Sequence, residues 1–198
     1  AAIEAGFAAD GRVLKFDTVL LGGVNENELL ALLDYAAARR AELRFIEYMD
    51  VGGATQWAPT SVVSRGDVLR IVGSARGPLR SLPGRGSAPA ERFALPSQQV
   101  FGIIASTTQP FCGACDRARL TADGHWYHCL YAPSGTDLKA PLRAGLSDAE
   151  LLSLIRDGWQ RRRDRGAEER LAHGQRGPLV PLDALRRDPR LEMHTRGG

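Results

Sequence analysis

The stretch Phe111–Tyr131 reads FCGACDRARLTADGHWYHCLY and holds all three cysteines of the 198-residue chain. Cys112 and Cys115 form a C-x-x-C pair, a spacing that places two thiols on one tight turn, close enough to bind one metal centre. Cys129 follows a hairpin-like turn at residues 122–124, between apolar or basic runs. The three cysteines therefore predict a metal site around which the rest of the chain is organised.

The number of thiols leaves two kinds of metal site open. A structural zinc ion is usually bound by four protein ligands, so one of the nearby histidines, His125 or His128, would complete it. A [4Fe–4S] cluster is normally held by four cysteines, so three would leave one iron free to bind another group. Unligated thiols, or one disulfide with a spare thiol, are a weaker alternative, because the chain has no cysteine outside this stretch.

Two arginines follow the C-x-x-C pair. Arg117 and Arg119 are two residues apart, so on an extended segment both guanidiniums point to one side. The guanidinium fork suits phosphate and carboxylate groups. Two arginines at this spacing are often only solvated surface residues, but beside a metal turn an anion-binding role is an equal alternative.

The motif F-C-G-A-C-D-R-A-R-L-T-A-D-G-(x)4-C-L resembles the C-terminal cluster motif of the GTP 3′,8-cyclases. These radical S-adenosylmethionine (SAM) enzymes carry out the first step of molybdenum cofactor biosynthesis. The resemblance implies a [4Fe–4S] cluster, whose free iron binds the purine of GTP, on Cys112, Cys115 and Cys129. It also implies GTP contacts from the segment after the second cysteine: Arg117, Ala118 and Arg119.

The first part of the chain has the pattern of a strand–helix–strand unit. Val13–Leu21 (VLKFDTVLL) is rich in β-branched and apolar residues and predicts a strand, in which Lys15 and Asp17 share one face. A helix follows, with an expected capping box of Asn25 and Glu28 and a core stripe of Leu29, Leu32, Leu33 and Ala36. Leu43–Met49 predicts the next strand, and this order favours parallel strands.

This unit extends the resemblance. K-F-D-T-V-L-L-G-G-V-N resembles the lysine-bearing strand of the cyclases, and R-F-I-E-Y-M resembles the strand that follows it. The resemblance implies that Lys15 contacts GTP and that Met49 contacts SAM. The pattern departs from the family at Asp17, where an asparagine is expected; a carboxylate there would attract Lys15 or repel phosphate.

The remaining segments give weaker signals. Ala1–Gly11 is interpreted as the end of a helix, and a helix is expected after Ser64. Ser147 with Glu150 predicts a capping box at the start of another helix. The other segments are interpreted as a surface excursion (73–91), a strand pair (92–95 and 99–106), a loop (133–142), a solvated charged helix end (161–165) and an irregular stretch (172–189).

The chain ends in Gly197-Gly198. A terminal double glycine is by default frayed and without function. In the cyclases, however, a C-terminal double glycine enters the active site and is needed for turnover, so the resemblance implies a catalytic role for both residues. Arg196 departs from the family pattern, which has an apolar residue there.

Composition indicates a soluble globular protein, with 43% hydrophobic and 25% charged residues. No apolar run approaches the roughly 18 residues of a membrane span, and the start shows no signal-peptide pattern. The net charge of +3 suits a phosphate ligand but is too small to require nucleic acid. Clustered cysteines are typical of metal ligands in a reducing compartment, so a cytoplasmic protein is expected.

The resemblance covers only the C-terminal part of a cyclase, somewhat over half. The radical SAM motif C-x-x-x-C-x-x-C is absent, because no cysteine precedes Cys112. The implied fold is α/β: residues 1–72 form the later part of an incomplete (β/α) TIM-like barrel, and residues 73–198 form the cluster and GTP-binding region with its Gly-Gly tail. A second [4Fe–4S] cluster belongs to the missing N-terminal part, so the chain is expected to be inactive alone.

The implied reaction is the SAM-dependent conversion of GTP to (8S)-3′,8-cyclo-7,8-dihydroguanosine 5′-triphosphate. It implies GTP, SAM and an electron donor as partners, and a homodimer in the full-length enzyme. The alternative is a zinc-stabilised nucleic-acid-binding module that uses the three cysteines and one histidine. That alternative explains the charge and the cysteines, but not the strand–helix–strand unit or the Gly-Gly tail.

Overall fold

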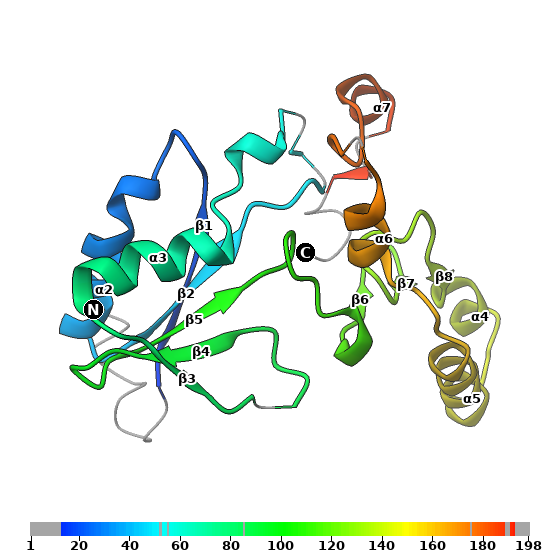
Figure 1. Ribbon diagram of the computed structural model, residues 1–198. Coiled ribbons are helices and arrows are strands. Elements are labelled where there is room, and N and C mark those ends of the chain that lie inside the picture. Colours follow the sequence, from blue (N-terminus) through cyan, green and yellow to red (C-terminus); the bar gives the residue numbers. More distant parts are fainter. Residues whose placement is uncertain are drawn as a thin grey trace. The chain divides into compact units, whose positions relative to one another are not determined.

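The computed structural model describes residues 13–51, 53–54, 56–84, 86–174, 176–188 and 191–192, which form two units (Figure 1). Unit 1 comprises the described residues of 1–49 and 59–111, and unit 2 those of 50–58 and 112–198. The helix end expected at Ala1–Gly11 and the tail Gly197-Gly198 lie outside the described residues.

Unit 1 is built on a five-stranded mixed sheet in the order β1-β2-β5-β4-β3. β1 is parallel to β2 and β2 to β5, whereas β4 pairs antiparallel with both β5 and β3. The strands are β1 (Lys15–Leu20), β2 (Glu42–Glu47), β3 (Arg80–Leu82), β4 (Glu91–Ala94) and β5 (Val100–Ile104). The helices are α2 (Leu29–Ala38), α3 (Arg65–Arg76) and the 3-10 turns η1 (Glu26–Glu28) and η2 (Pro59–Ser61). The α/β class, the parallel strand–helix–strand unit and the β4–β5 pair are therefore confirmed.

The two faces of this sheet differ in chemistry. One row of aligned residues is apolar and joins the hydrophobic core with α2 and α3: Phe16, Leu43, Phe101 and Phe93. The next row is polar and lies on the opposite face, because side chains alternate along a strand: Asp17, Arg44, Gly102 and Arg92. Each fully buried apolar side chain contributes about 1.5–3 kcal/mol, which fixes the register and leaves the polar row away from the helices.

The helix starts in unit 1 are only partly as expected. Asn25 does not cap the first helix, because its side chain closes the turn after β1: Oδ1 accepts from the Leu21 amide at 2.8 Å and Nδ2 donates to the Val19 carbonyl at 3.0 Å. The capping box expected there is wrong, and α2 begins after η1. The start of α3 at Ser64 is confirmed, with a reciprocal capping box to Asp67.

Unit 2 contains the cysteine turn and is built from short elements. The hairpin of β6 (Arg119–Leu120) and β7 (His125–Tyr127) turns at the expected place, where Gly124 adopts a φ of 90°. A side chain at Gly124 would also meet Lys139, whose Cβ would lie 2.5 Å from an added Cβ. The other elements are η3 (Cys112–Ala114), β8 (Thr136–Asp137), α4 (Lys139–Arg143), α5 (Asp148–Gln160), α6 (Gly166–Ala172) and α7 (Leu182–Arg187).

Three stretches interpreted as irregular contain regular structure. Residues 73–91 include the last turn of α3 and all of β3, residues 133–142 include β8 and most of α4, and residues 172–189 include α7. Strands as short as β3 and β8 have no period of their own and depend on their pairing partners. The capping box of Ser147 and Glu150 at the start of α5 is confirmed.

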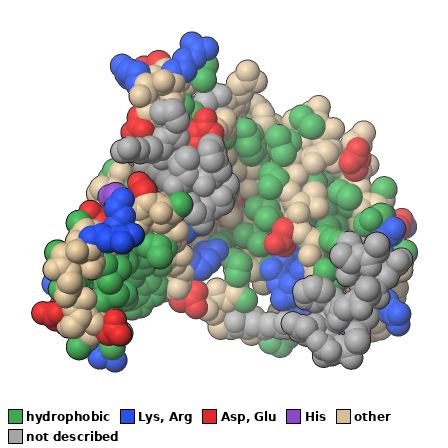
Figure 2. Space-filling model, turned by 180° about the vertical axis from the view of Figure 1, so that it is seen from behind, with side chains coloured by type: hydrophobic (Ala, Val, Ile, Leu, Met, Phe, Trp, Pro, Cys, Tyr) green, Lys and Arg blue, Asp and Glu red, His purple; other side chains and the backbone are tan. Residues whose placement is uncertain are grey.

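The amphipathic helix α5 packs against the β6–β7 hairpin through aromatic contacts. Trp159 stacks on Trp126 with ring centroids 6.4 Å apart, and His128 lies edge-on to both rings. Leu152 and Trp159 remain exposed, and Figure 2 shows hydrophobic side chains gathered over this helix. Among the described residues, no helix has both the length and the apolar character needed to cross a membrane.

Candidate metal centre

The cysteines lie on two neighbouring segments of unit 2. Cys112 opens the 3-10 turn η3, and the Cys115 amide closes it by donating to the Cys112 carbonyl at 3.2 Å. The β6–β7 hairpin then returns the chain, so that Cys129 follows two residues after β7. All three are free thiols and are half-buried.

The pKa values of two of the thiols and of Arg119 reflect burial and the charges near them. Burial alone raises the pKa of Cys115, but the Arg117 amide and guanidinium, together with Arg162, hold it below its ordinary value. Burial raises the pKa of Cys129, which also feels Cys112. Burial and the charge of Arg117 lower the pKa of Arg119, whereas Cys129 and Cys115 oppose this. The negative charges of thiolates at Cys115 and Cys129 would thus interact with Arg117 or Arg119.

The arrangement fits an iron–sulfur cluster. Within the described ranges, no group of three or more His, Cys, Asp and Glu side chains converges as ligands of one metal ion. A [4Fe–4S] cluster differs from a single ion, because each cysteine binds a different iron at a corner of the cluster. The three thiols of unit 2 are soft ligands, and the Arg117 guanidinium beside Cys115 supplies compensating charge of the kind that such a cluster needs.

The two histidines of the zinc alternative have other contacts. His125 Nδ1 lies 3.5 Å from a carboxylate oxygen of Asp123. His128 lies against Trp126, with ring centroids 4.1 Å apart, and its Nε2 atom is buried without a hydrogen-bond partner in the described structure. Burial lowers the pKa of His128, with Asp164 opposing. His128 therefore sits in the apolar contact between the hairpin and α5.

The predicted nucleotide contacts after Cys115 lie beside the thiols. Arg117 Nη2 is 3.4 Å from Cys115 Sγ. Ala118 follows. Arg119 is the first residue of β6 and is half-buried. Within the part of the chain that the structure describes, Arg119 forms no hydrogen bond or ion pair, so its guanidinium is available to an anion. The turn thus places Arg117 against Cys115, with Arg119 two residues further along the chain.

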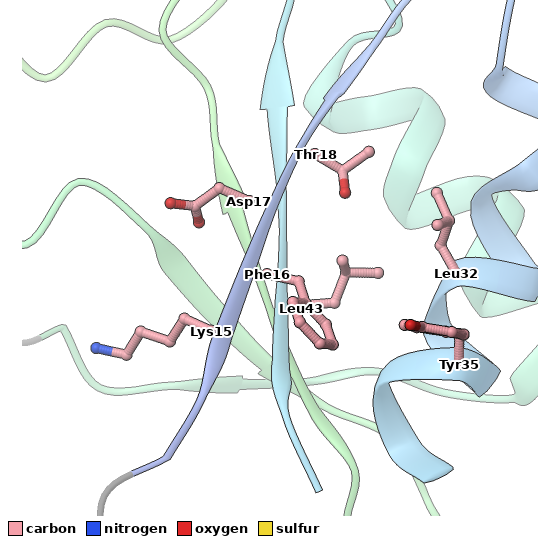
Figure 3. A pocket seen from close by; sticks show the side chains of 7 residues that line it. All are labelled: Lys15, Phe16, Asp17, Thr18, Leu32, Tyr35 and Leu43. Atoms are coloured by element: carbon pink, nitrogen blue, oxygen red, sulfur yellow. The ribbon is translucent and has the colours of Figure 1, made fainter. Parts of the chain in front are cut away.

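Lys15 belongs to unit 1 and lines a pocket there. The pocket has a volume of about 390 Å³ and is lined by Lys15, Phe16, Asp17, Thr18, Leu32, Tyr35 and Leu43. Figure 3 shows Lys15 and Asp17 on one side of β1, and Phe16, Leu32 and Tyr35 on the other. Asp17 Oδ1 lies 3.9 Å from Arg44 Nη1, so its carboxylate faces an arginine of β2. Lys15 has no ion pair with another described residue.

Sequence reasoning missed two arginines on this polar face. Arg44 and Arg92 donate through Nε to the buried carboxylate of Glu42, at 3.4 and 3.1 Å. They lie on the same face of the sheet as Lys15 and Asp17. The strand register aligns Asp17 with Arg44, and Gly102 of β5 is aligned with both Arg44 and Arg92. The sequence signal was the alternation of polar and apolar side chains within β2. It places Glu42 and Arg44 on one face, but the face can be identified only when the neighbouring strands are known.

Met49 lies just beyond the carboxyl end of β2 and is half-buried. The strand end beside it is fixed by Glu47, whose buried carboxylate accepts from the Arg65, Thr107 and Thr108 amides at 2.7–2.8 Å. Thr107 Oγ1 also donates to the Tyr48 carbonyl at 3.0 Å. Carboxyl ends of parallel strands are the usual ligand sites of α/β proteins, so this location suits the predicted role of Met49.

The interpretation of residues 161–165 as a solvated helix end is wrong for Arg162. Its side chain is 11% exposed and donates from Nη1 to the carbonyls of Cys115 and Arg117, at 3.0 and 3.1 Å. Nε donates to Asp164 at 3.0 Å, and the guanidinium lies 4.9 Å from the ring centre of Trp159. A tryptophan three residues before an arginine at a helix end was the only local signal.

Together these features define an α/β protein with a separate unit that carries the three cysteines and several arginines. Residues 41–168 match the family model described as Molybdenum Cofactor Synthesis C, and the chain belongs to this family.

Three curated relatives are similar to the chain. A GTP 3′,8-cyclase 1 of Mycobacterium tuberculosis (strain CDC 1551) is 52% identical over 198 residues, which are all of this chain and 55% of the relative. A GTP 3′,8-cyclase 3 of Mycobacterium bovis is 52% identical over 99% of this chain and 52% of its own length. A GTP 3′,8-cyclase of Synechococcus sp. (strain WH7803) is 44% identical over 93% of this chain and 52% of its own length. The chain thus spans about half the length of these relatives.

Proposed function

We propose that this chain is the C-terminal, GTP-binding part of a radical SAM GTP 3′,8-cyclase, a lyase of molybdenum cofactor biosynthesis. The complete enzyme would convert GTP to (8S)-3′,8-cyclo-7,8-dihydroguanosine 5′-triphosphate. The observation that carries the proposal is the cysteine turn: Cys115 Sγ lies 3.4 Å from Arg117 Nη2, and Arg119 follows two residues on, in a chain of this family. The names of relatives that are 44–52% identical support it.

Cys112, Cys115 and Cys129 would hold a [4Fe–4S] cluster, which when bound supplies an open iron for the guanine base. The low pKa of Cys115 favours the thiolate, the form that binds iron. Arg117 would keep its guanidinium against this thiolate and present its remaining donors to the nucleotide. Desolvated guanidinium groups bind phosphate strongly, which suits Arg119.

The other proposed contacts come from residues outside the cysteine turn. Lys15 would bind GTP from the polar face of β1, with Ala118 contributing at the cysteine turn, and Met49 would contact SAM. Fixing both reacting parts of GTP in register is the main contribution of such groups to the rate. Gly197 and Gly198 would complete the active site.

The proposed architecture is the later part of an incomplete (β/α) TIM-like barrel. Three parallel strands, with β1 at the edge of the described sheet, support it. The SAM-cleaving [4Fe–4S] cluster would belong to a preceding segment, so these 198 residues would be inactive alone. The proposal includes an electron donor, a homodimer of the complete enzyme and a cytoplasmic location, where reduced thiols persist.

A chimera tests the activity. The chain is joined to the N-terminal part of the 52% identical Mycobacterium tuberculosis relative and assayed anaerobically with GTP, SAM and a reductant. The chimera should form the cyclic product, and the same chimera with Cys129→Ser should not. The chain by itself should form no product. A folded chimera that leaves GTP unchanged would contradict the proposal, and so would turnover by the chain alone.

A further inference from the structure

The segment Arg162–Glu168 lies beside the cysteine turn and Cys129. It follows α5, and sequence alone suggested a solvated charge run at its start. We propose that Arg162 is a positioning residue: it fixes the backbone between Cys115 and Arg117, so that a cluster thiol and a nucleotide-binding guanidinium stay together. This inference rests on the proposed function.

The Arg162 side chain binds two carbonyls of the cysteine turn at once. One nitrogen, Nη1, donates to the carbonyls of Cys115 and Arg117, at 3.0 and 3.1 Å. Asp164 accepts from Nε at 3.0 Å and so orients the guanidinium plane. Trp159 lies 4.9 Å away on α5 and provides an apolar surface for it. The side chain is thus held by its own helix end while it binds two carbonyls of the turn.

The consequence concerns Arg117. With the carbonyls before and after Asp116 both held, the backbone from Cys115 to Arg117 has a fixed course. The Arg117 guanidinium then lies 3.4 Å from Cys115 Sγ. Without Arg162 the two carbonyls lose a charged donor, and the turn gains freedom just where the thiol and the guanidinium must be in register.

The rest of the segment lies beside Cys129 and Gly113. Gly166 is buried beside Cys129: a Cβ added there would lie 3.1 Å from Cys129 Sγ and 2.5 Å from Tyr131 Cβ. Glu168 forms an ion pair with Arg165. A Cβ added at Gly113, the residue after Cys112, would lie 3.5 Å from Arg165 Nη2. Arg162 therefore belongs to a continuous segment that supports the turn from several sides.

The test uses three variants of the chain. Arg162→Gln removes the charge and the donors, whereas Arg162→Lys keeps the charge and removes the planar guanidinium fork. Arg161→Gln is the matched control, because Arg161 is exposed at the end of the same helix and has no contact with the cysteine turn among the described residues. The readouts are the GTP dissociation constant of the iron-loaded chain, its electron paramagnetic resonance spectrum, and amide hydrogen exchange over residues 112–119 without metal.

Both Arg162 variants should weaken GTP binding about tenfold and speed exchange over 112–119 about tenfold, as expected for loss of charged hydrogen bonds. Both should also alter the cluster spectrum, and Arg161→Gln should match the wild type. If Arg162→Lys matches the wild type, charge alone suffices and the positioning role is overturned. If exchange over 112–119 is unchanged in both variants, the inference is also overturned.

The exchange measurement separates this inference from the proposed function. A wild-type chain that takes up no cluster and binds no GTP would refute the proposed function. Faster exchange confined to residues 112–119 in the Arg162 variants would still establish that Arg162 holds the turn. Faster exchange throughout unit 2 would instead show a general structural role and overturn the inference.

Discussion

The carboxylate of Asp50 and the guanidinium of Arg176 form two hydrogen bonds, Nε to Oδ2 at 3.0 Å and Nη2 to Oδ1 at 3.1 Å, across a sequence separation of 126. Asp50 is fully buried and also accepts from Arg170, at 2.7 and 2.9 Å, and from the Tyr131 hydroxyl at 2.9 Å. This carboxylate joins the segment after Met49 to Tyr131, to α6 and to the chain beyond α6, all within unit 2.

Asp50→Asn should lower the free energy of unfolding of unit 2 by about 3 kcal/mol, because removing one partner of a buried ion pair leaves uncompensated charge. Tryptophan fluorescence during urea unfolding measures this directly, since Trp57, Trp126 and Trp159 all belong to unit 2. Asp183→Asn is the control: its ion pair with Arg187 is exposed, so the change should stay below about 1 kcal/mol. Equal losses in the two variants would contradict the role of Asp50.

The same network predicts a dependence on pH. Burial raises the pKa of Asp50, but hydrogen bonds from Arg176, Arg170 and Tyr131 outweigh it and hold the pKa below 3.8. A carboxyl with a lowered pKa in the folded state contributes stability above its unfolded pKa and loses it as the pH falls through the folded pKa. Unit 2 should therefore lose stability in acid below about pH 4. Urea unfolding followed at decreasing pH should show a smaller loss in Asp50→Asn; an unchanged pH profile in that variant would rule the assignment out.

Gly166→Ala should disturb the cysteine site. The added Cβ would lie 2.5 Å from Tyr131 Cβ and 3.1 Å from Cys129 Sγ, so one of them must move. Overpacking of this kind costs about 1–3 kcal/mol, and iron uptake should fall with it. Gly174→Ala is the control, because an added Cβ there meets nothing within 4 Å. Iron content after reconstitution is the measurement, and full iron uptake by Gly166→Ala would contradict the prediction.

Arg119→Gln should weaken GTP binding by about tenfold or more, because a charged hydrogen bond to phosphate contributes about 1.5–3 kcal/mol. The loss should shrink as salt concentration rises. Titration calorimetry with the iron-loaded chain measures it, with Arg143→Gln on α4 as an exposed control of equal charge change. An affinity equal to that of the control would remove Arg119 from the proposed site.

Local patterns were enough to predict β1, α3, α5 and the β6–β7 turn, because periodicity, capping residues and the turn sequence all act within a few residues. Asn25 has the residue type of a helix cap, yet the turn after β1 uses its side chain. Strands β3 and β8 exist only because neighbouring strands pair with them.

The candidate site divides in the same way. The spacing of Cys112, Cys115 and Cys129 predicts their role as metal ligands, and the motif predicts the role of Arg117 and Arg119. The role of Arg162 could not, because its carbonyl partners lie 47 and 45 positions away. Arg44 and Arg92 were missed for the same reason: only the register between strands places them on the face of Lys15.

The most direct test of the account is anaerobic reconstitution of the chain with iron and sulfide, followed by metal analysis and electron paramagnetic resonance with and without GTP. The account predicts about four irons per chain and a spectrum that GTP changes, both lost when Cys112, Cys115 and Cys129 are replaced by serine. Stoichiometric zinc without a cluster, or a cluster spectrum that GTP leaves unchanged, would contradict it.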